Sequence, residues 1–88
     1  MTARRTDANQ PEIVQALRDA GREVQDLHEV GHGCPDLLVL CPSGRWVLLE
    51  VKMPGATLTA REIRWHTQFA AGPRYIVRTV TAALEVTG

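Results

Sequence analysis

Apolar and polar positions recur with a helical period near the start of the chain and with a strand period after it. The apolar positions of the helical stretch are Ile13, Val14, Leu17 and Ala20, and a glycine follows them. Asn9 is suited to cap this helix, and Glu12 lies three residues later, as in a capping box. We therefore predict a helix over residues 9–20 and a first strand over residues 22–30.

Two apolar runs, over residues 36–41 and 45–52, flank a short Pro-Ser-Gly turn. The first run is apolar on both faces, which is typical of a central strand, and the turn predicts an antiparallel hairpin. Residues i and i+2 of a strand point to the same side, so Glu50 and Lys52 share one face and apolar side chains share the other. Charged groups on an apolar strand are costly to bury unless they are paired or bind a metal.

The rest of the chain predicts a second helix, a short strand and a last segment that is a helix or an irregular tail. Thr59 and Glu62 form a capping box at the start of the second helix, which a Gly-Pro pair stops after residue 71. The strand covers residues 75–78. A right-handed crossover through the second helix places this strand parallel to a central one. The predicted fold class is α/β, in the order α-β-β-β-α-β, with a mixed central sheet flanked by helices.

The 88 residues, of which 44% are hydrophobic, predict one small globular domain covering residues 1–88. We expect residues 1–8, which include Arg4 and Arg5, to form a flexible basic arm. No apolar run approaches the ~20 residues that span a bilayer, and the N-terminus lacks the apolar segment of a secretory signal. Two cysteines fit a reducing compartment, so we expect a cytoplasmic protein. A core this small favours a homo-oligomer.

The net charge is zero, which weakens a nucleic-acid interpretation, because binding to phosphates usually leaves a basic footprint. Nine of the ten basic residues are arginines, and the only lysine is Lys52. Lysine carries a compact charge whose pKa changes on burial, whereas arginine stays protonated. The single lysine is consistent with a site that requires an ammonium group.

Asp36 begins the first strand of the hairpin and Glu50 lies near the end of the second, so antiparallel pairing brings the two acids together. Paired carboxylates are hard oxygen ligands suited to Mg²⁺ or Mn²⁺, and the backbone carbonyl of Val51 could add a neutral ligand. Such an ion lowers the pKa of bound water and stabilises charge on a phosphoryl group. Lys52 could position that water. The alternative is a hairpin with a surface salt bridge.

These residues resemble a known nuclease motif. Pro35-Asp36, thirteen intervening residues and Glu50-Val51-Lys52 match the PD-(D/E)XK pattern. The flanking Gly33-x-Pro-Asp and Leu58-Thr-x-x-Glu62 segments resemble the VRR-NUC branch of that superfamily. The likeness extends over most of the chain and implies a restriction-endonuclease-like core.

The resemblance implies a Mg²⁺- or Mn²⁺-dependent DNA endonuclease of bacterial or phage type. Members of this length look like homodimers that resolve branched DNA such as Holliday junctions or nick supercoiled DNA. The implied catalytic set is Glu12, Asp36, Glu50 and Lys52, and the implied metal ligands are Asp36, Glu50, Val51 and Glu12. A residue of the second helix, often a glutamine in this branch, commonly assists the site. This chain has Glu62 there, which we interpret chiefly as a cap.

Five basic residues are candidates for contact with nucleic acid: Arg61, Arg64, His32, Arg4 and Arg5. A solvated helical face is the alternative for the two on the second helix. Trp65 and Phe69 are four residues apart, and we interpret them as core or dimer contacts. The alternative function is a catalytically inactive nucleic-acid-binding accessory module of the same fold, which the zero net charge favours.

Overall fold

The computed structural model describes residues 7–88, and the order of its elements confirms the predicted α/β class. The elements are α1 (Gln10–Asp19), β1 (Glu23–Asp26), β2 (Leu37–Leu40), β3 (Trp46–Val51), α2 (Ala60–Gln68), β4 (Arg74–Val77) and α3 (Val80–Val86). Arg4, Arg5 and most of the predicted N-terminal arm lie outside the described residues. Within residues 7–88, every helix is too short or too polar to cross a membrane.

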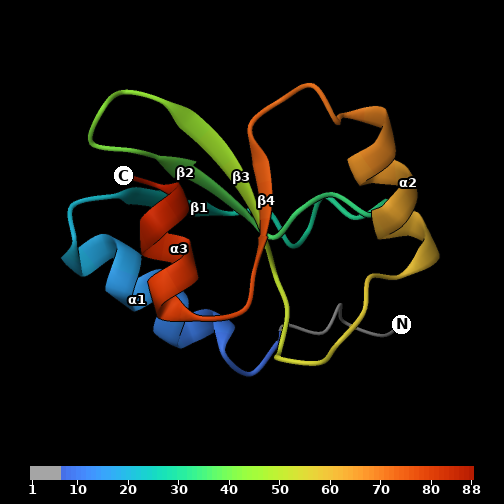
Figure 1. The fold of residues 1–88 in the computed structure, drawn as a ribbon, viewed down its shortest axis with the longest axis horizontal. Coiled ribbons are helices and arrows are strands. Elements are labelled where there is room, and N and C mark those ends of the chain that lie inside the picture. Colours follow the sequence, from blue (N-terminus) through green and yellow to red (C-terminus); the bar gives the residue numbers. More distant parts are fainter. Residues whose placement is uncertain (1–6) are drawn as a thin grey trace.

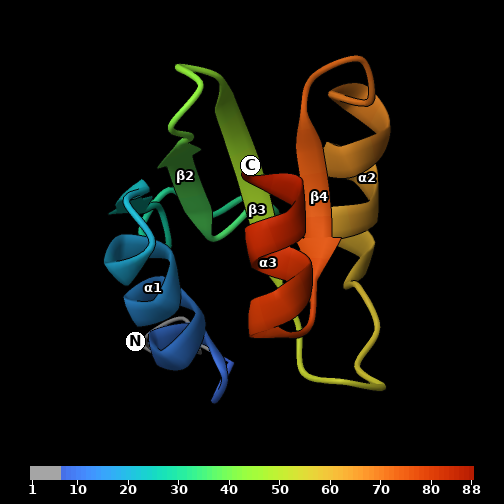
Figure 2. The ribbon, with the colours of Figure 1, turned by 60° about the vertical axis from the view of Figure 1, so that its left-hand side comes forward.

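The four strands form one mixed sheet in the order β1-β2-β3-β4. β1 and β2 pair antiparallel, as do β2 and β3, whereas β3 and β4 pair parallel. The parallel pair requires a crossover, which α2 supplies. α1 and α3 lie side by side on one face of the sheet, and α2 lies on the other (Figures 1 and 2).

The face beneath α1 and α3 is the hydrophobic core. Its buried side chains are Ile13, Leu17, Leu37, Val39, Cys41, Val47, Leu49, Val51, Val77 and Ala83. β3 shows the alternation clearly, because Val47, Leu49 and Val51 are at most 1% exposed on this face. Glu50 and Lys52 therefore point to the opposite face, toward α2. The sheet thus has one apolar face and one that carries charged groups.

The start of α1 differs from the prediction. Asn9 occupies the N-cap position, but its side chain makes no capping hydrogen bond. Its Nδ2 instead donates to the carbonyl oxygens of Lys52 and Arg78, each at 3.1 Å. Backbone carbonyls at strand ends need such partners. Asn9 therefore joins α1 to the ends of β3 and β4, and the capping role predicted for it is wrong.

Several boundaries also differ from the predictions. The first strand ends at Asp26 and not at residue 30, because the chain turns after it: the Leu27 amide donates to the Asp36 carbonyl, and the Val30 amide to the Leu27 carbonyl. α2 ends at Gln68, before the predicted residue 71. The segment left open as helix or tail is a helix, with Thr79 Oγ1 accepting from the Ala82 amide.

A glycine lets the loop before β2 touch α2. Gly33 has φ +80°, and a Cβ at this position would lie 2.3 Å from the carbonyl oxygen of Arg61 in the first turn of α2. Neighbouring Gly31 also has a positive φ, +72°, but a Cβ there would meet nothing within 4 Å. The backbone contact at Gly33 fixes the start of α2 beside Asp36.

We expect Gly33→Ala to destabilise the protein more than Gly31→Ala. Both variants place a side chain in the left-handed region, which costs about 1–2 kcal/mol. Gly33→Ala adds a clash with backbone that cannot rotate away, worth about 1–3 kcal/mol more. Urea denaturation of the two variants measures the difference. Equal free energies of unfolding would contradict the close packing of this loop on α2.

Candidate active site

The hairpin brings Asp36 and Glu50 together. Leu37 pairs with Leu49 in the β2–β3 register, so Asp36 and Glu50 are the next residues on the two strands at this end of the hairpin. The Asp36 amide donates to the Leu49 carbonyl at 3.0 Å, and Asp36 Oδ2 accepts from the Val51 amide at 2.8 Å. Backbone on both sides therefore fixes the Asp36 carboxylate. Asp36 is 6% exposed and Glu50 1%.

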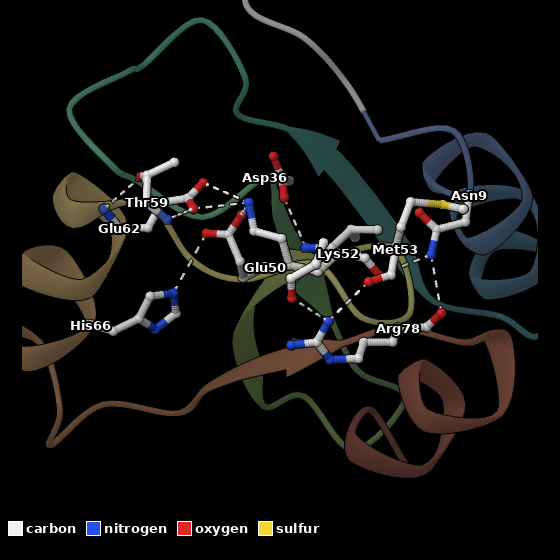
Figure 3. A network of polar contacts seen from close by, with 11 residues as sticks. Asn9, Asp36, Glu50, Lys52, Met53, Thr59, Glu62, His66 and Arg78 are labelled. Carbon is white, nitrogen blue, oxygen red and sulfur yellow. Dashed lines mark hydrogen bonds and ion pairs between the residues drawn. The ribbon is translucent and has the colours of Figure 1, made fainter.

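The carboxyl group of Glu50 is buried without a hydrogen bond from any residue that the structure describes. Lys52 Nζ lies 3.8 Å from Oε2, and His66 Nε2 lies 3.5 Å from Oε1 (Figure 3). Burial, together with the nearby Asp36 and the charge of Glu62, raises the pKa of Glu50 to about 9, against the lowering effect of Lys52. In the absence of a cation, Glu50 therefore carries a proton at neutral pH.

Lys52 is held by Glu62, whose two oxygens lie 2.8 and 3.0 Å from Nζ. Burial lowers the pKa of Lys52, but the hydrogen bond to Glu62 and the charges of Glu62, Glu50 and Asp7 outweigh it and raise the pKa overall. Lys52 is therefore an ammonium group. It can donate hydrogen bonds and stabilise negative charge, but it is not a proton acceptor in this arrangement.

Glu62 has two roles at the start of α2. The predicted capping box is confirmed, because the Thr59 amide donates to Glu62 Oε1 and the Glu62 amide donates to Thr59 Oγ1. The bond to Lys52 is the second role, which the sequence did not predict. Burial raises the pKa of Glu62, but the hydrogen bonds from Lys52 and from Thr59 lower it overall, so Glu62 is a carboxylate that matches the ammonium of Lys52.

His66 is the site residue that sequence reasoning missed. It is 6% exposed and faces Glu50, whereas Trp65 is half-buried and Phe69 is 45% exposed. Trp65 and Phe69 do contact each other, with ring centroids 4.5 Å apart. The side chain that points inward from the helix is nevertheless that of His66, and not those of this aromatic pair. The signal for His66 was its distance of four residues from Glu62, which places both on one side of α2.

Side chains on one face of β3 and on one side of α2 recur at nearly the same interval. Residues i and i+2 of a strand are about 6.7 Å apart, and residues i and i+4 of a helix rise by about 6 Å. Glu50 and Lys52 of the β3 segment can therefore face His66 and Glu62 of α2 pairwise. The acid lies opposite the imidazole and the ammonium opposite the carboxylate, as Figure 3 shows.

At the α1 end of the site, Glu12 is exposed. Its catalytic role stays a prediction. Asp7 borders the same groove as Lys52. Gln10 is 3% exposed, and its Oε1 has no partner among the described residues.

The donor set fits a hard divalent cation that keeps much of its water. In the described part of the chain, no three His, Cys, Asp or Glu side chains are grouped as a complete metal cage. Mg²⁺ is commonly held by one or two carboxylates together with waters and substrate phosphates. Asp36 and Glu50, whose carboxyl oxygens have no hydrogen-bond partner among the described residues, supply two carboxylates. The carbonyl of Val51 as a further ligand stays a prediction.

An open groove of about 430 Å³ leads to Lys52 and Glu62. The loop 31–33, Thr59 and Arg61 also line it. A second hollow of about 250 Å³ continues from it along α2, because His32 and Arg61 border both. Its other lining residues are Arg64, Trp65 and Gln68. The predicted basic residues His32, Arg61 and Arg64 thus line the groove that leads to Lys52 or the hollow next to it.

Glu50→Gln should stabilise the metal-free protein. Glu50 has a folded pKa of about 9 against 4.5 in the unfolded chain, so its stabilising protonation is complete below about pH 4.5 and lost as the pH rises through 9. Glutamine stays neutral at every pH, so the variant does not lose stability as the pH rises. We expect a gain on the order of 1 kcal/mol at pH 8, or about 4–8 °C in Tm. Thermal unfolding in EDTA from pH 5 to pH 9 measures it; a stability difference that does not change with pH would contradict the assignment.

Comparisons with known proteins agree with the geometry. Residues 2–82 match the model of the VRR-NUC domain. Over 75 residues, the chain is 33% identical to "Putative nuclease p44" of Acyrthosiphon pisum secondary endosymbiont phage 1, covering 83% of this chain and 81% of that protein. A solved structure titled "VRR_NUC domain" superposes with a TM-score of 0.72 at 25% identity, covering 88% of this chain and 87% of that one. The resemblance of the motif is thereby confirmed, and the chain belongs to the VRR-NUC domain family of nucleases.

Proposed function

We propose that this chain is a Mg²⁺- or Mn²⁺-dependent DNA endonuclease. One observation carries the proposal: Glu50 is buried beside Asp36, next to an ammonium group, and neither of its carboxyl oxygens has a hydrogen-bond partner among residues 7–88. A buried acid of this kind is unfavourable for folding alone, but it is suited to a cation. The membership of a nuclease family supports hydrolysis of a phosphodiester as the reaction.

Each residue of the site has its own part in this reaction. Asp36 and Glu50 would hold the ion, which lowers the pKa of bound water and offsets charge on the phosphate. Lys52 donates hydrogen bonds to the attacking water or to a phosphate oxygen, and Glu62 keeps its ammonium in place. Glu50 would have to be ionised to hold the ion, since a ligand carboxylate must be deprotonated. Glu12 would complete or water-bridge the ligand shell.

The nucleic-acid strand would follow the two joined hollows along α2. Arg61 and Arg64 provide charges for backbone phosphates, and both are exposed. His32 lies where the hollows meet and has φ 56°, a left-handed conformation that is uncommon outside glycine and is often found at functional sites. A local basic track of this kind reconciles DNA binding with a net charge of zero. Arg4 and Arg5 stay candidates for further contacts with DNA.

The proposal includes a homodimer acting on branched DNA such as Holliday junctions, or nicking supercoiled DNA. One site cuts one strand, so paired cuts need two protomers related by a twofold axis. An apolar hollow of about 250 Å³ lined by Leu38, Trp46, Leu48, Phe69 and Pro73 among others lies away from the groove. Trp46 is 55% and Phe69 45% exposed. This patch supports a contact with a second copy.

The setting we propose is the cytoplasm of a bacterial or phage-infected cell. Within residues 7–88 no disulfide joins Cys34 and Cys41, which is compatible with a reducing compartment. The phage origin of a relative with 33% identity supports this setting.

Purified protein with Mn²⁺ should cleave four-way junctions or supercoiled plasmid, and EDTA should stop it. Asp36→Ala and Lys52→Ala should each lower the cleavage rate on the order of 10²- to 10³-fold, because each removes charge stabilisation from the transition state. Asp19→Ala removes an exposed acid at the far end of α1 and should cleave like the wild type. Gel assays on branched, duplex and single-stranded DNA make the comparison, and light scattering gives the mass of the active species.

DNA binding without cleavage in any divalent cation would sink the enzyme assignment and favour the inactive accessory module. Cleavage that survives Asp36→Ala unchanged would show a contaminating nuclease.

Arg61→Ala and Arg64→Ala should weaken DNA binding and flatten its salt dependence. Removing one bond to a phosphate reduces the slope of log K against log salt by roughly one. Arg45→Ala is the control, because Arg45 lies in the turn at the other end of β3 and bonds the Val86 carbonyl. Fluorescence anisotropy over a series of salt concentrations measures the slopes. Equal slopes for all three variants would rule out the track along α2.

A further inference from the structure

The imidazole of His66 is a buried polar group that the proposed function does not use. Its Nδ1 and Nε2 are both buried and lack a hydrogen-bond partner among the described residues. The same holds for both carboxyl oxygens of Glu50, which lies across from it. Two unsatisfied buried groups, 3.5 Å apart at their nearest atoms, face each other between α2 and β3 (Figure 3).

We propose that His66 is a positioning residue: its Nε2–H directs one oxygen of Glu50 away from the cation, so that the other oxygen is presented as a metal ligand. The inference rests on the proposed metal-dependent function. His66 lies beside Oε1 of Glu50, and Lys52 lies beside Oε2. A carboxylate that binds an ion through one oxygen leaves its second oxygen in need of a donor. His66 is the described donor nearest to that oxygen.

The separation of 3.5 Å needs to shorten by only a few tenths of an ångström to give a normal N–H···O bond. Active-site hydrogen bonds are often long in the unloaded protein and shorten in the complex. Ligand carboxylates are in turn commonly fixed by a hydrogen-bond donor, and loss of that donor weakens metal binding. The geometry here is that of such a donor.

His66 is itself held from two sides. Its backbone carbonyl accepts a hydrogen bond from Arg74 Nε at 3.0 Å, which ties this turn of α2 to β4. The ring of Trp65 stands edge-on to the imidazole, with centroids 5.3 Å apart. A ring that served only to fill space beside an apolar strand could be an apolar side chain at lower cost. An imidazole at this position therefore indicates that its nitrogen atoms take part in a hydrogen bond.

Two conservative variants test the proposal. In His66→Gln the side-chain amide can reach the position of Nε2, whereas in His66→Asn it is one carbon too short. Affinity for Mn²⁺, measured by calorimetry without DNA, should stay close to the wild-type value in His66→Gln and fall about 10- to 100-fold in His66→Asn. Thr67→Ala, an exposed neighbour on α2, should bind Mn²⁺ like the wild type. Thermal unfolding in EDTA reports folding separately.

The outcomes distinguish this inference from the proposed function. Equal Mn²⁺ affinities for the Gln and Asn variants overturn the positioning role, whether or not the protein cleaves DNA. A merely structural role would lower the Tm of both variants without separating their affinities. If Mn²⁺ affinity depends on His66 as expected while the wild type cleaves no DNA, the positioning role stands and the endonuclease assignment fails.

Discussion

Burial of the Glu50 carboxyl group is the constraint on which the rest of this structure depends. An acid that is 1% exposed and has no hydrogen-bond partner in the described part of the chain opposes folding, and the raised pKa of Glu50 expresses that cost. The apolar residues that alternate with it, Val47, Leu49 and Val51, bind β3 to the core and hold the acid in place. The apolar face of one strand thus stabilises the position of a charge on its other face.

α2 supplies the partners for the charged side chains on the polar face of the sheet. Its residues Glu62 and His66 lie opposite Lys52 and Glu50 because the strand and the helix repeat at nearly the same interval. The contact at Gly33 fixes the helix where this match occurs. Few side chains of α2 contribute to an apolar core, so the helix is held by its ion pairs with Glu50 and Lys52, by the contact at Gly33 and by the hydrogen bond from Arg74 to the His66 carbonyl.

The sequence predicted the fold well because hydrophobic periodicity and turn residues are local signals. The hairpin, the capping box at Thr59 and the pairing of Asp36 with Glu50 followed from them. The first strand was predicted too long because alternation continues beyond Asp26, whereas the partner strand begins only at Leu37. Asn9 and His66 were misjudged for another reason: their partners are 43 or 69 residues away for Asn9 and on another element for His66, which no local pattern encodes.

The balance of charges explains why a cation would have to precede a phosphate in the proposed reaction. Asp36, Glu50 and Glu62 contribute three formal negative charges when ionised, and Lys52 contributes one positive charge, which leaves an excess of two negative charges. While Glu50 is protonated the excess is one negative charge, which would already repel a phosphodiester, and a divalent cation would cancel the two that remain once Glu50 is ionised. Because both oxygens of Glu62 contact Lys52, the charge of Glu62 offsets much of the positive charge that Lys52 would otherwise supply to Asp36 and Glu50. A glutamine at position 62 would bond Lys52 without the charge, so the glutamate found here would make the proposed site more dependent on a metal.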